Sequence, residues 1–256
     1  MIVVSGHQPV YLPWLGLLHK AALADRFVFM DDVQYLRQDW NNRNKIRTPA
    51  GWQWLTAPVA LRASASDLLK DIRLSNEGWG NKGHWQTEHF NSFQRNYART
   101  PYWADHLPWL ESFYLSQCWE SLAQMNRHML DYLLGAFGIS TEIVVASEMG
   151  FVGRKSDLVL DHARRLGAGV VVTGALGRDY IIEEDFRRLG VHVWFQQYEH
   201  PVYTQRWPGF EPAMCAFDLL LNHGPESKDI LMRGNAQRSE VISAAEQALA
   251  IRSNTQ

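Results

Sequence analysis

Cysteine is scarce in this sequence: among 256 residues only Cys118 and Cys215 occur. Two cysteines cannot form the several cross-links that hold small secreted proteins together, and this pair lacks the close spacing of metal ligands. We therefore expect both thiols to be reduced and buried. The shortage excludes a disulfide-stabilised scaffold and a cysteine-based zinc site.

Long apolar runs and an excess of either charge are missing as well. No stretch approaches the roughly 20 apolar residues of a membrane-spanning helix. The chain opens with a strand-like segment that lacks a charged lead and a small-residue cleavage site, so we expect a cytoplasmic protein. A net charge of -2 without basic runs argues against a nucleic-acid partner. A small-molecule substrate, with a nucleotide-sugar as one candidate, fits this composition better.

Hydrophobic and aromatic residues are plentiful. The 46% of hydrophobic residues can bury a large core, which indicates one large domain or one domain with an insertion. The chain has 11 Trp, 9 Tyr and 11 Phe, and most of these are expected to pack inside the protein. Trp and Tyr also suit the flat face of a sugar, so some of them are candidates for ligand contact.

The first 34 residues have the pattern of a βαβ unit. An apolar run from Ile2 to Val4 predicts a buried strand, and turn-forming residues follow at once. Apolar residues recur at helical spacing from Trp14 to Leu23, and residues 27–30 predict a second strand. Runs without alternation are typical of parallel strands that are buried on both faces.

Polar side chains follow both of these predicted strands. His7 and Gln8 come directly after the first, and Asp31, Asp32 and Gln34 come directly after the second. Ligands of open parallel sheets bind outside the carboxyl ends of the strands. The sequence therefore predicts one crevice that these five side chains face, although Asp31 and Asp32 cannot both point into it if the strand continues through them.

The next segments predict a hairpin and then helices. Residues 37–46 form a polar cluster in which Arg43 would bind an anion or form a surface ion pair. A turn at 48–51 and an alternating strand at 52–59 indicate the hairpin. Helical spacing dominates about residues 77–140, and the scattered histidines there favour packing or surface positions over a metal site.

The second half returns to α/β. Strands are predicted at 142–147, 169–174 and 191–195, with helices between them, and Arg178 and Tyr180 follow the middle strand. His200 and Tyr203 lie in a polar, aromatic segment after the last strand. We expect a single α/β domain over residues 1–256 with a parallel sheet and a helical insertion at about 77–140. The alternative is two independent domains divided near Gly138.

Several segments together resemble the WbqC-like protein family. They are HQPVYLPWLG, DDVQ, NRNKIRTPAGWQWLTAPV, VVVTGALGRDYI, EHPVYTQ and FDLLLNHG. Members are bacterial proteins found mainly with genes for surface-polysaccharide and modified-sugar biosynthesis. The resemblance covers nearly the whole chain in the family's order, and it implies a role in that biosynthesis.

A second resemblance concerns the fold. The order of strand, His-containing turn, helix and strand is similar to the opening of nucleotidylyltransferases and pantothenate synthetases, which implies a Rossmann-like sheet. Those enzymes bind ATP phosphates with a His-x-Gly-His pair in the first helix. This chain has Trp14-Leu15-Gly16-Leu17 there, and it contains no G-x-x-x-x-G-K-[ST] loop. Both differences argue against ATP use, and the sequence identifies no cofactor.

These patterns favour an enzyme that transfers an acyl or aminoacyl group to a sugar or to another small-molecule amine or hydroxyl. His7 would be the general base, because an imidazole near its unperturbed pKa exchanges protons at neutral pH. Asp31 or Asp32 would orient it, and backbone N–H groups of residues 174–177 would hold the oxyanion. The predicted substrate-binding residues are Gln8, Gln34, Arg43, Arg178, Tyr180, His200 and Tyr203. The alternatives are an adenylylating, nucleotidyltransferase-like ligase and a non-catalytic sugar-binding or assembly protein, and the oligomeric state stays open.

Overall fold

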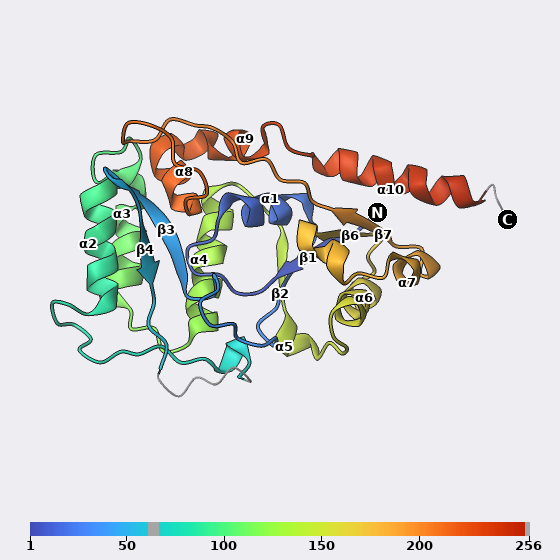
Figure 1. Ribbon diagram of the computed structural model, residues 1–256, viewed down its shortest axis with the longest axis horizontal. Helices are drawn as coiled ribbons and strands as arrows, with labels where there is room; N and C mark the ends of the chain where they lie inside the picture. Colours follow the sequence, from blue (N-terminus) through green and yellow to red (C-terminus); the bar gives the residue numbers. More distant parts are fainter. Residues whose placement is uncertain (61–66, 254–256) are drawn as a thin grey trace.

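A five-stranded parallel sheet and a separate antiparallel hairpin make up the β structure (Figure 1). The computed structural model describes residues 1–60 and 67–253, with side chains through residue 250. The sheet consists of β1 (Val3–His7), β2 (Arg26–Phe29), β5 (Glu142–Val145), β6 (Val170–Thr173) and β7 (His192–Phe195). The hairpin consists of β3 (Arg43–Thr48) and β4 (Gly51–Thr56). The predicted α/β class with a parallel sheet is confirmed.

The strand order is β5-β2-β1-β6-β7, so the amino-terminal strand is central. Ser5 of β1 is paired with Phe27 of β2 on one side and with Val172 of β6 on the other. The order therefore runs outward from β1 in both directions. At such a reversal the connections leave on opposite faces, and a crevice opens between the two central strands.

Helices cover both faces of the sheet. On one face, Val3 and Val172 pack against α1 (Leu15–Leu23) and α10 (Arg238–Ser253). On the other face, Val4 and Val171 lie under α6 (Ser156–Arg165), α7 (Glu183–Arg188) and the short α5 (Ala146–Met149). Successive valines of one strand point to opposite faces, which explains why these strands are apolar without alternation.

The chain between β2 and β5 contains the hairpin and three main helices. These are α2 (Trp85–Tyr97), α3 (Trp103–Glu111) and α4 (Leu122–Ala136), with the short 3-10 helix η1 (Leu69–Asp71) and the π-helix η2 (Ser112–Ser116). They share one apolar core with α1, β2 and α8 (Ala216–His223), to which Phe29, Phe93, Phe113 and Phe217 contribute. The arrangement as a single domain with an insertion at about 77–140 stays a prediction.

Three local features differ from the sequence-based expectations. The predicted hairpin is present, but its first strand, Arg43–Thr48, lies in the polar cluster, and Cys118, which was expected to be buried, is exposed. After α8 and the turn η4 (Gly224–Glu226), the chain adds α9 (Ser227–Met232) and α10, which the sequence pattern did not reveal. Among the α10 side chains that the structure describes, Val241 and Ala245 are buried in the core and Ile242 packs against it, so the apolar stripe is too narrow to recognise. Among the described helices, none has the length and apolar character needed to cross a membrane.

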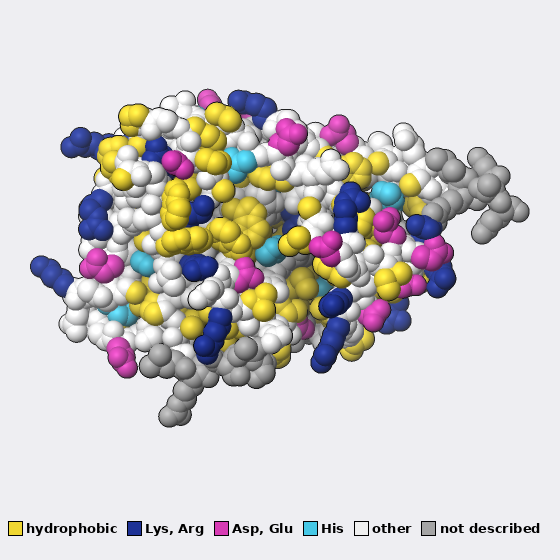
Figure 2. All heavy atoms as spheres, in the orientation of Figure 1, with side chains coloured by type: hydrophobic (Ala, Val, Ile, Leu, Met, Phe, Trp, Pro, Cys, Tyr) yellow, Lys and Arg dark blue, Asp and Glu magenta, His cyan; other side chains and the backbone are white. Residues whose placement is uncertain are grey.

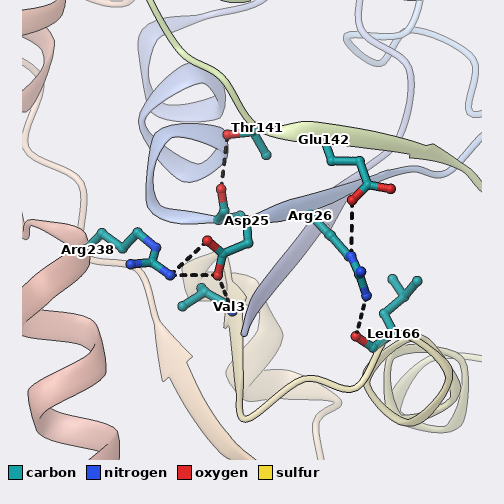
Figure 3. A network of polar contacts seen from close by, with 8 residues as sticks. Val3, Asp25, Arg26, Thr141, Glu142, Leu166 and Arg238 are labelled. Atoms are coloured by element: carbon teal, nitrogen blue, oxygen red, sulfur yellow. Dashed lines mark hydrogen bonds and ion pairs between the residues drawn. The ribbon is translucent and has the colours of Figure 1, made fainter. Parts of the chain in front are cut away.

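Asp25 joins three elements at the amino edge of the sheet (Figure 3). Its carboxylate accepts the N–H of Val3 at 2.8 Å and a guanidinium N–H of Arg238 at 2.7 and 2.8 Å. Burial alone would raise the pKa of Asp25, but the bonds from Arg238 and Val3 and the charge of Arg238 lower it overall. The start of α10 is thereby fastened to β1 and β2, on the edge opposite the crevice.

Asp25→Ala is expected to lower the free energy of unfolding by about 1 kcal/mol at pH 7, because the carboxylate is partly exposed and water weakens its ion pair. The folded-state pKa lies below the ordinary value of 3.8, so this contribution is present above that pH and disappears as the pH falls further. Urea unfolding at pH 7 and pH 3 measures the difference. Glu142→Ala, which removes a more exposed partner of Arg26, is the control with little effect. An equal loss at both pH values would contradict the assignment.

Candidate functional site

A cleft of about 550 Å³ opens where the strand order reverses. Its floor and one wall come from Gly6 and His7 of β1 and from the start of α1, and the opposite wall comes from residues 173–177 after β6. Concave sites at this position of a parallel sheet are the usual ligand sites. We therefore take this cleft, here called the central cleft, as the candidate functional site.

His7 is the last residue of β1 and faces the central cleft. Its Nδ1 lies 2.9 Å from the carbonyl oxygen of Gln8, and because a carbonyl only accepts, Nδ1 carries the proton and Nε2 the lone pair. The ring meets Trp14 edge to face at 5.2 Å. Burial, aided by the charge of Lys20, lowers the pKa of His7 to about 3. The expectation of an unperturbed imidazole is therefore wrong, and the ring is neutral at neutral pH.

Lys20 lies beside His7 and was missed by the sequence-based prediction. It sits in the second turn of α1 with 5% of its surface exposed, and its Nζ donates to the carbonyl oxygen of Gly6 at 2.9 Å. Burial lowers the pKa of Lys20 to about 8. The sequence did contain one indication of this burial: Lys20 lies close to Leu18 and Ala21 in a helix whose other residues are mainly apolar.

The loop from Gln8 to Trp14 is held in place by groups from other elements. The Asn41 amide donates to the carbonyl oxygen of Pro9 at 2.8 Å, and the Asn44 amide donates to that of Leu12. Leu12 has a φ of 52°, which is unfavourable for a residue with a branched side chain and needs such support. These bonds keep the wall of the central cleft next to His7 in one conformation.

The opposite wall is a 3-10 turn, η3 (Ala175–Asp179), followed by Tyr180. A Cβ on Gly177 would lie 2.4 Å from the Thr173 hydroxyl, so only glycine allows this turn to pack on the end of β6. Residues 174–177 do line the central cleft, as an oxyanion site requires. Their role as oxyanion donors stays a prediction.

The aspartates after β2 lie elsewhere. Asp31 accepts the backbone N–H of Ser147 at 2.9 Å and its hydroxyl at 2.7 Å, and it faces a second pocket that Lys70 and Trp119 also line. Burial, and the charge of Asp31, raise the pKa of Asp32. Neither aspartate lines the central cleft. The carbonyl of Gln8, rather than a carboxylate, is the partner of the His7 Nδ1.

Of the other predicted residues, only Gln8 and Tyr180 join His7 in the central cleft. Arg43 stacks on Trp54, and Arg178 stacks on Phe195 beside a neighbouring pocket. The remaining ones are placed as follows: Gln34 in an isolated bridge with Leu68, His200 stacked on Tyr203, and the Tyr203 hydroxyl bonded to Asp218. Besides Lys20, the cleft residues that the sequence did not single out include Asp39, Trp40, Asn41 and Gln196.

Metal binding has no obvious centre in the described part of the chain. No three His, Cys, Asp or Glu side chains gather there closely enough to hold an ion. What the central cleft offers instead is a neutral imidazole, a buried amine of lowered pKa and backbone groups. This set can move a proton and stabilise a developing negative charge without a large rearrangement.

Comparisons with known proteins agree with the motifs. The model of the WbqC-like protein family matches residues 8–230. The chain is 32% identical over 225 residues to "Uncharacterized protein Rv1507c" of Mycobacterium tuberculosis (strain ATCC 25618 / H37Rv), which covers 88% of this chain and 95% of that protein. No solved structure is significantly similar. The family match begins directly after β1 and spans the hairpin, the other four strands of the sheet and α8, and on that basis the chain belongs to the WbqC-like protein family.

Proposed function

We propose that this protein is an enzyme that transfers an acyl or aminoacyl group to an amine or hydroxyl of a sugar or other small molecule, in surface-polysaccharide or modified-sugar biosynthesis. The observation that carries the proposal is the pairing of His7 and Lys20 in the central cleft. The strand order supports a Rossmann-like sheet, similar to that of nucleotidylyltransferases, as its framework.

The two side chains suit the two needs of acyl transfer. The acceptor nitrogen or oxygen attacks the carbonyl carbon of a thioester or acyl phosphate, and its proton passes to the Nε2 of His7. The carbonyl oxygen becomes negative and is held by the Lys20 ammonium, which uses one of its three N–H bonds on Gly6. When the carbonyl re-forms, the thiolate or phosphate departs and takes the proton from His7. All groups then return to their starting states.

The low pKa of His7 has two causes: burial is the larger, and the charge of Lys20 is the smaller one, which can change during the reaction. The ammonium repels a proton on the imidazole and so lowers its pKa. The negative charge that develops on the carbonyl oxygen beside Lys20 offsets the positive charge of the ammonium, so the ammonium repels a proton on His7 less strongly. The imidazole therefore becomes a stronger base during the step in which it receives the proton.

His7→Ala is expected to reduce turnover by about 100-fold or more, the usual effect of removing a general base. Purified protein is incubated with nucleotide-sugars and acyl donors, with and without ATP, and the products are weighed by mass spectrometry. His223→Ala, at the end of α8 and outside the central cleft, is the control that retains turnover. Full turnover in His7→Ala contradicts the proposal. Release of AMP or pyrophosphate supports the adenylylating ligase instead, and binding without a mass change supports a sugar-binding protein.

A further inference from the structure

A row of tryptophans leads out of the central cleft onto the hairpin. Trp14 and Trp40 line the cleft, and their ring centres are 5.8 Å apart. Trp40 lies 5.4 Å from Trp54, and Trp54 lies 5.9 Å from Trp52. Trp14 in turn contacts the His7 ring. We call these four side chains the aromatic track. It is a continuous ring-to-ring path from His7 to the outer strand of the hairpin.

Three members of the aromatic track are exposed to an extent unusual for tryptophan: Trp40 by 37%, Trp54 by 39% and Trp52 by 45%. Trp52 and Trp54 alternate along β4 with residues that turn inward, and Leu55 is buried behind them. Figure 2 shows hydrophobic side chains gathered in the middle of the face it presents, from the hairpin toward the centre of the molecule. An apolar surface that continues directly from a cleft is typical of a ligand site.

Two cations of β3 lie along the same track. The Arg43 guanidinium is 4.7 Å above the Trp54 ring, and the Lys45 ammonium is 4.7 Å from Trp52 and 5.7 Å from Trp54. Within the described residues neither cation forms an ion pair with a carboxylate. Stacking on the rings fixes both charges in place, so a negative ligand group can meet them with little loss of side-chain freedom.

We propose that the aromatic track binds an acidic oligosaccharide, a chain of carboxylate-bearing sugars whose terminal unit lies in the central cleft. Each pyranose presents a flat face of C–H groups for an indole and, in a uronic acid, a carboxylate for Arg43 or Lys45. The successive ring separations of 5 to 6 Å match a chain of linked rings. This inference rests on the proposed function and makes the acceptor an extended, negatively charged saccharide rather than a free monosaccharide.

Single-stranded nucleic acid also combines flat rings with negative charges, but the track fits it less well. Proteins that stack successive bases use a positively charged groove, and this chain carries a net charge of -2. Neighbouring rings of the track are tilted by 45° to 81°. Cations also cover one side of Trp52 and Trp54. Sugar units joined by rotatable glycosidic bonds can follow such tilts, whereas a column of parallel stacked bases cannot.

Titration calorimetry on the full chain tests the inference with four probes: galacturonate, its linear tetramer, the carboxyl-reduced tetramer and an oligothymidine of equal length. We expect the acidic tetramer to bind about tenfold more tightly than the monomer or the reduced tetramer, since one good contact is worth about a factor of ten. Trp52→Ala and Lys45→Gln should each weaken tetramer binding about fivefold and leave monomer binding unchanged. Arg188→Gln, an exposed cation on α7, is the control with unchanged affinity.

Three results would overturn the aromatic track as a saccharide site: equal affinity for the reduced tetramer, unchanged tetramer affinity in both hairpin variants, or tighter binding of oligothymidine that Trp52→Ala abolishes. The proposed reaction is tested separately by His7→Ala. If the tetramer binds as expected but no substrate is turned over, the proposed function fails and the track stands. If His7-dependent turnover occurs without preference for the acidic tetramer, the track fails and the proposed function stands.

Discussion

Asp218→Ala is expected to lower the free energy of unfolding by about 4 kcal/mol, because three buried donors would lose their acceptor. Asp218 is fully buried at the start of α8 and accepts bonds from the Tyr97 hydroxyl at 2.9 Å, the Tyr203 hydroxyl at 2.8 Å and the Gln205 amide at 2.8 Å. Burial raises the pKa of Asp218, and these bonds oppose that shift. In a chain of this length the loss corresponds to a decrease in Tm of roughly 10 °C.

Guanidinium chloride unfolding, followed by far-UV circular dichroism, measures the effect. Asp218→Asn keeps the volume and one acceptor oxygen, so we expect about half the loss of the alanine variant. Tyr203→Phe removes a single bond and should cost about 1 kcal/mol. If Asp218→Ala were no less stable than Tyr203→Phe, the carboxylate would not be the centre of the network.

The Asp218 network also explains how the hairpin is positioned. The Tyr97 hydroxyl accepts the backbone N–H of Arg47 in β3 at 2.8 Å, and the Arg47 guanidinium donates to the Gln205 amide oxygen at 3.2 Å. Gln205 and Tyr97 both bond to Asp218. The inner side of the hairpin is thus tied to α2, α8 and the segment around residue 205. Its outer side is left to carry the aromatic track.

Lys20→Met is expected to raise the free energy of unfolding by about 2 kcal/mol at pH 7. Burial lowers the pKa of Lys20 from 10.5 to about 8. The charged amine is therefore less stable in the folded state than in the unfolded state, and at pH 7 its burial costs folding free energy. Methionine fills a similar volume without a charge, although the bond to the Gly6 carbonyl is lost. The gain would show that Lys20 is retained for a purpose other than stability.

The pH dependence of this gain has a definite sign. Below pH 8 both states keep the proton and the full penalty of the buried ammonium is present. Between pH 8 and 10.5 the folded state releases its proton first, so the wild-type chain recovers stability and the advantage of Lys20→Met shrinks. Unfolding at pH 7 and pH 10 measures both values, with Lys82→Met, an exposed position, as the control. A constant advantage at the two pH values would contradict the role of the charge.

Lys20→Met should lower turnover although it raises stability. If the ammonium holds the oxyanion, wild-type turnover decreases as the pH rises through about 8, and Lys20→Met has low turnover without this decrease. A rise through pH 8 would instead mean that neutral Lys20 takes the proton, and it would remove His7 from the role of general base. The pH-rate profile therefore separates two assignments of the same pair.

The sheet could be predicted because its strands need no information from distant residues. Val170 to Val172 are apolar on both faces, and a short run of this kind between turns has few alternatives. The hairpin was predicted from its turn and its second strand, whereas the first strand, Arg43–Thr48, has no apolar run by which it could be recognised. Its buried Asn44 and Arg47 are satisfied by Leu12 and Gln205, far away in the sequence, so a polar pattern hides a strand with a well-packed inner side.

The lining of the central cleft, the candidate site, was predicted in part for a similar reason. Position after a strand identified His7, Gln8 and Tyr180, because strand ends are local features. The partner of Asp31 depends on which strand pairs with β2. That strand is β5, and Ser147, which follows it, donates its hydroxyl to the Asp31 carboxylate. Lys20 was hidden because a lysine in an amphipathic helix is normally exposed, and only the packing of α1 against the sheet buries it.

The aromatic track has an optical consequence. Indole rings in contact pass excitation energy to one another, so Trp14, Trp40, Trp54 and Trp52 emit and absorb as a coupled group rather than as four separate chromophores. One end of that group touches His7 on the floor of the central cleft. A molecule that enters the cleft is therefore expected to alter the near-ultraviolet spectrum of residues well outside it, which would make the four tryptophans a spectroscopic reporter of occupancy.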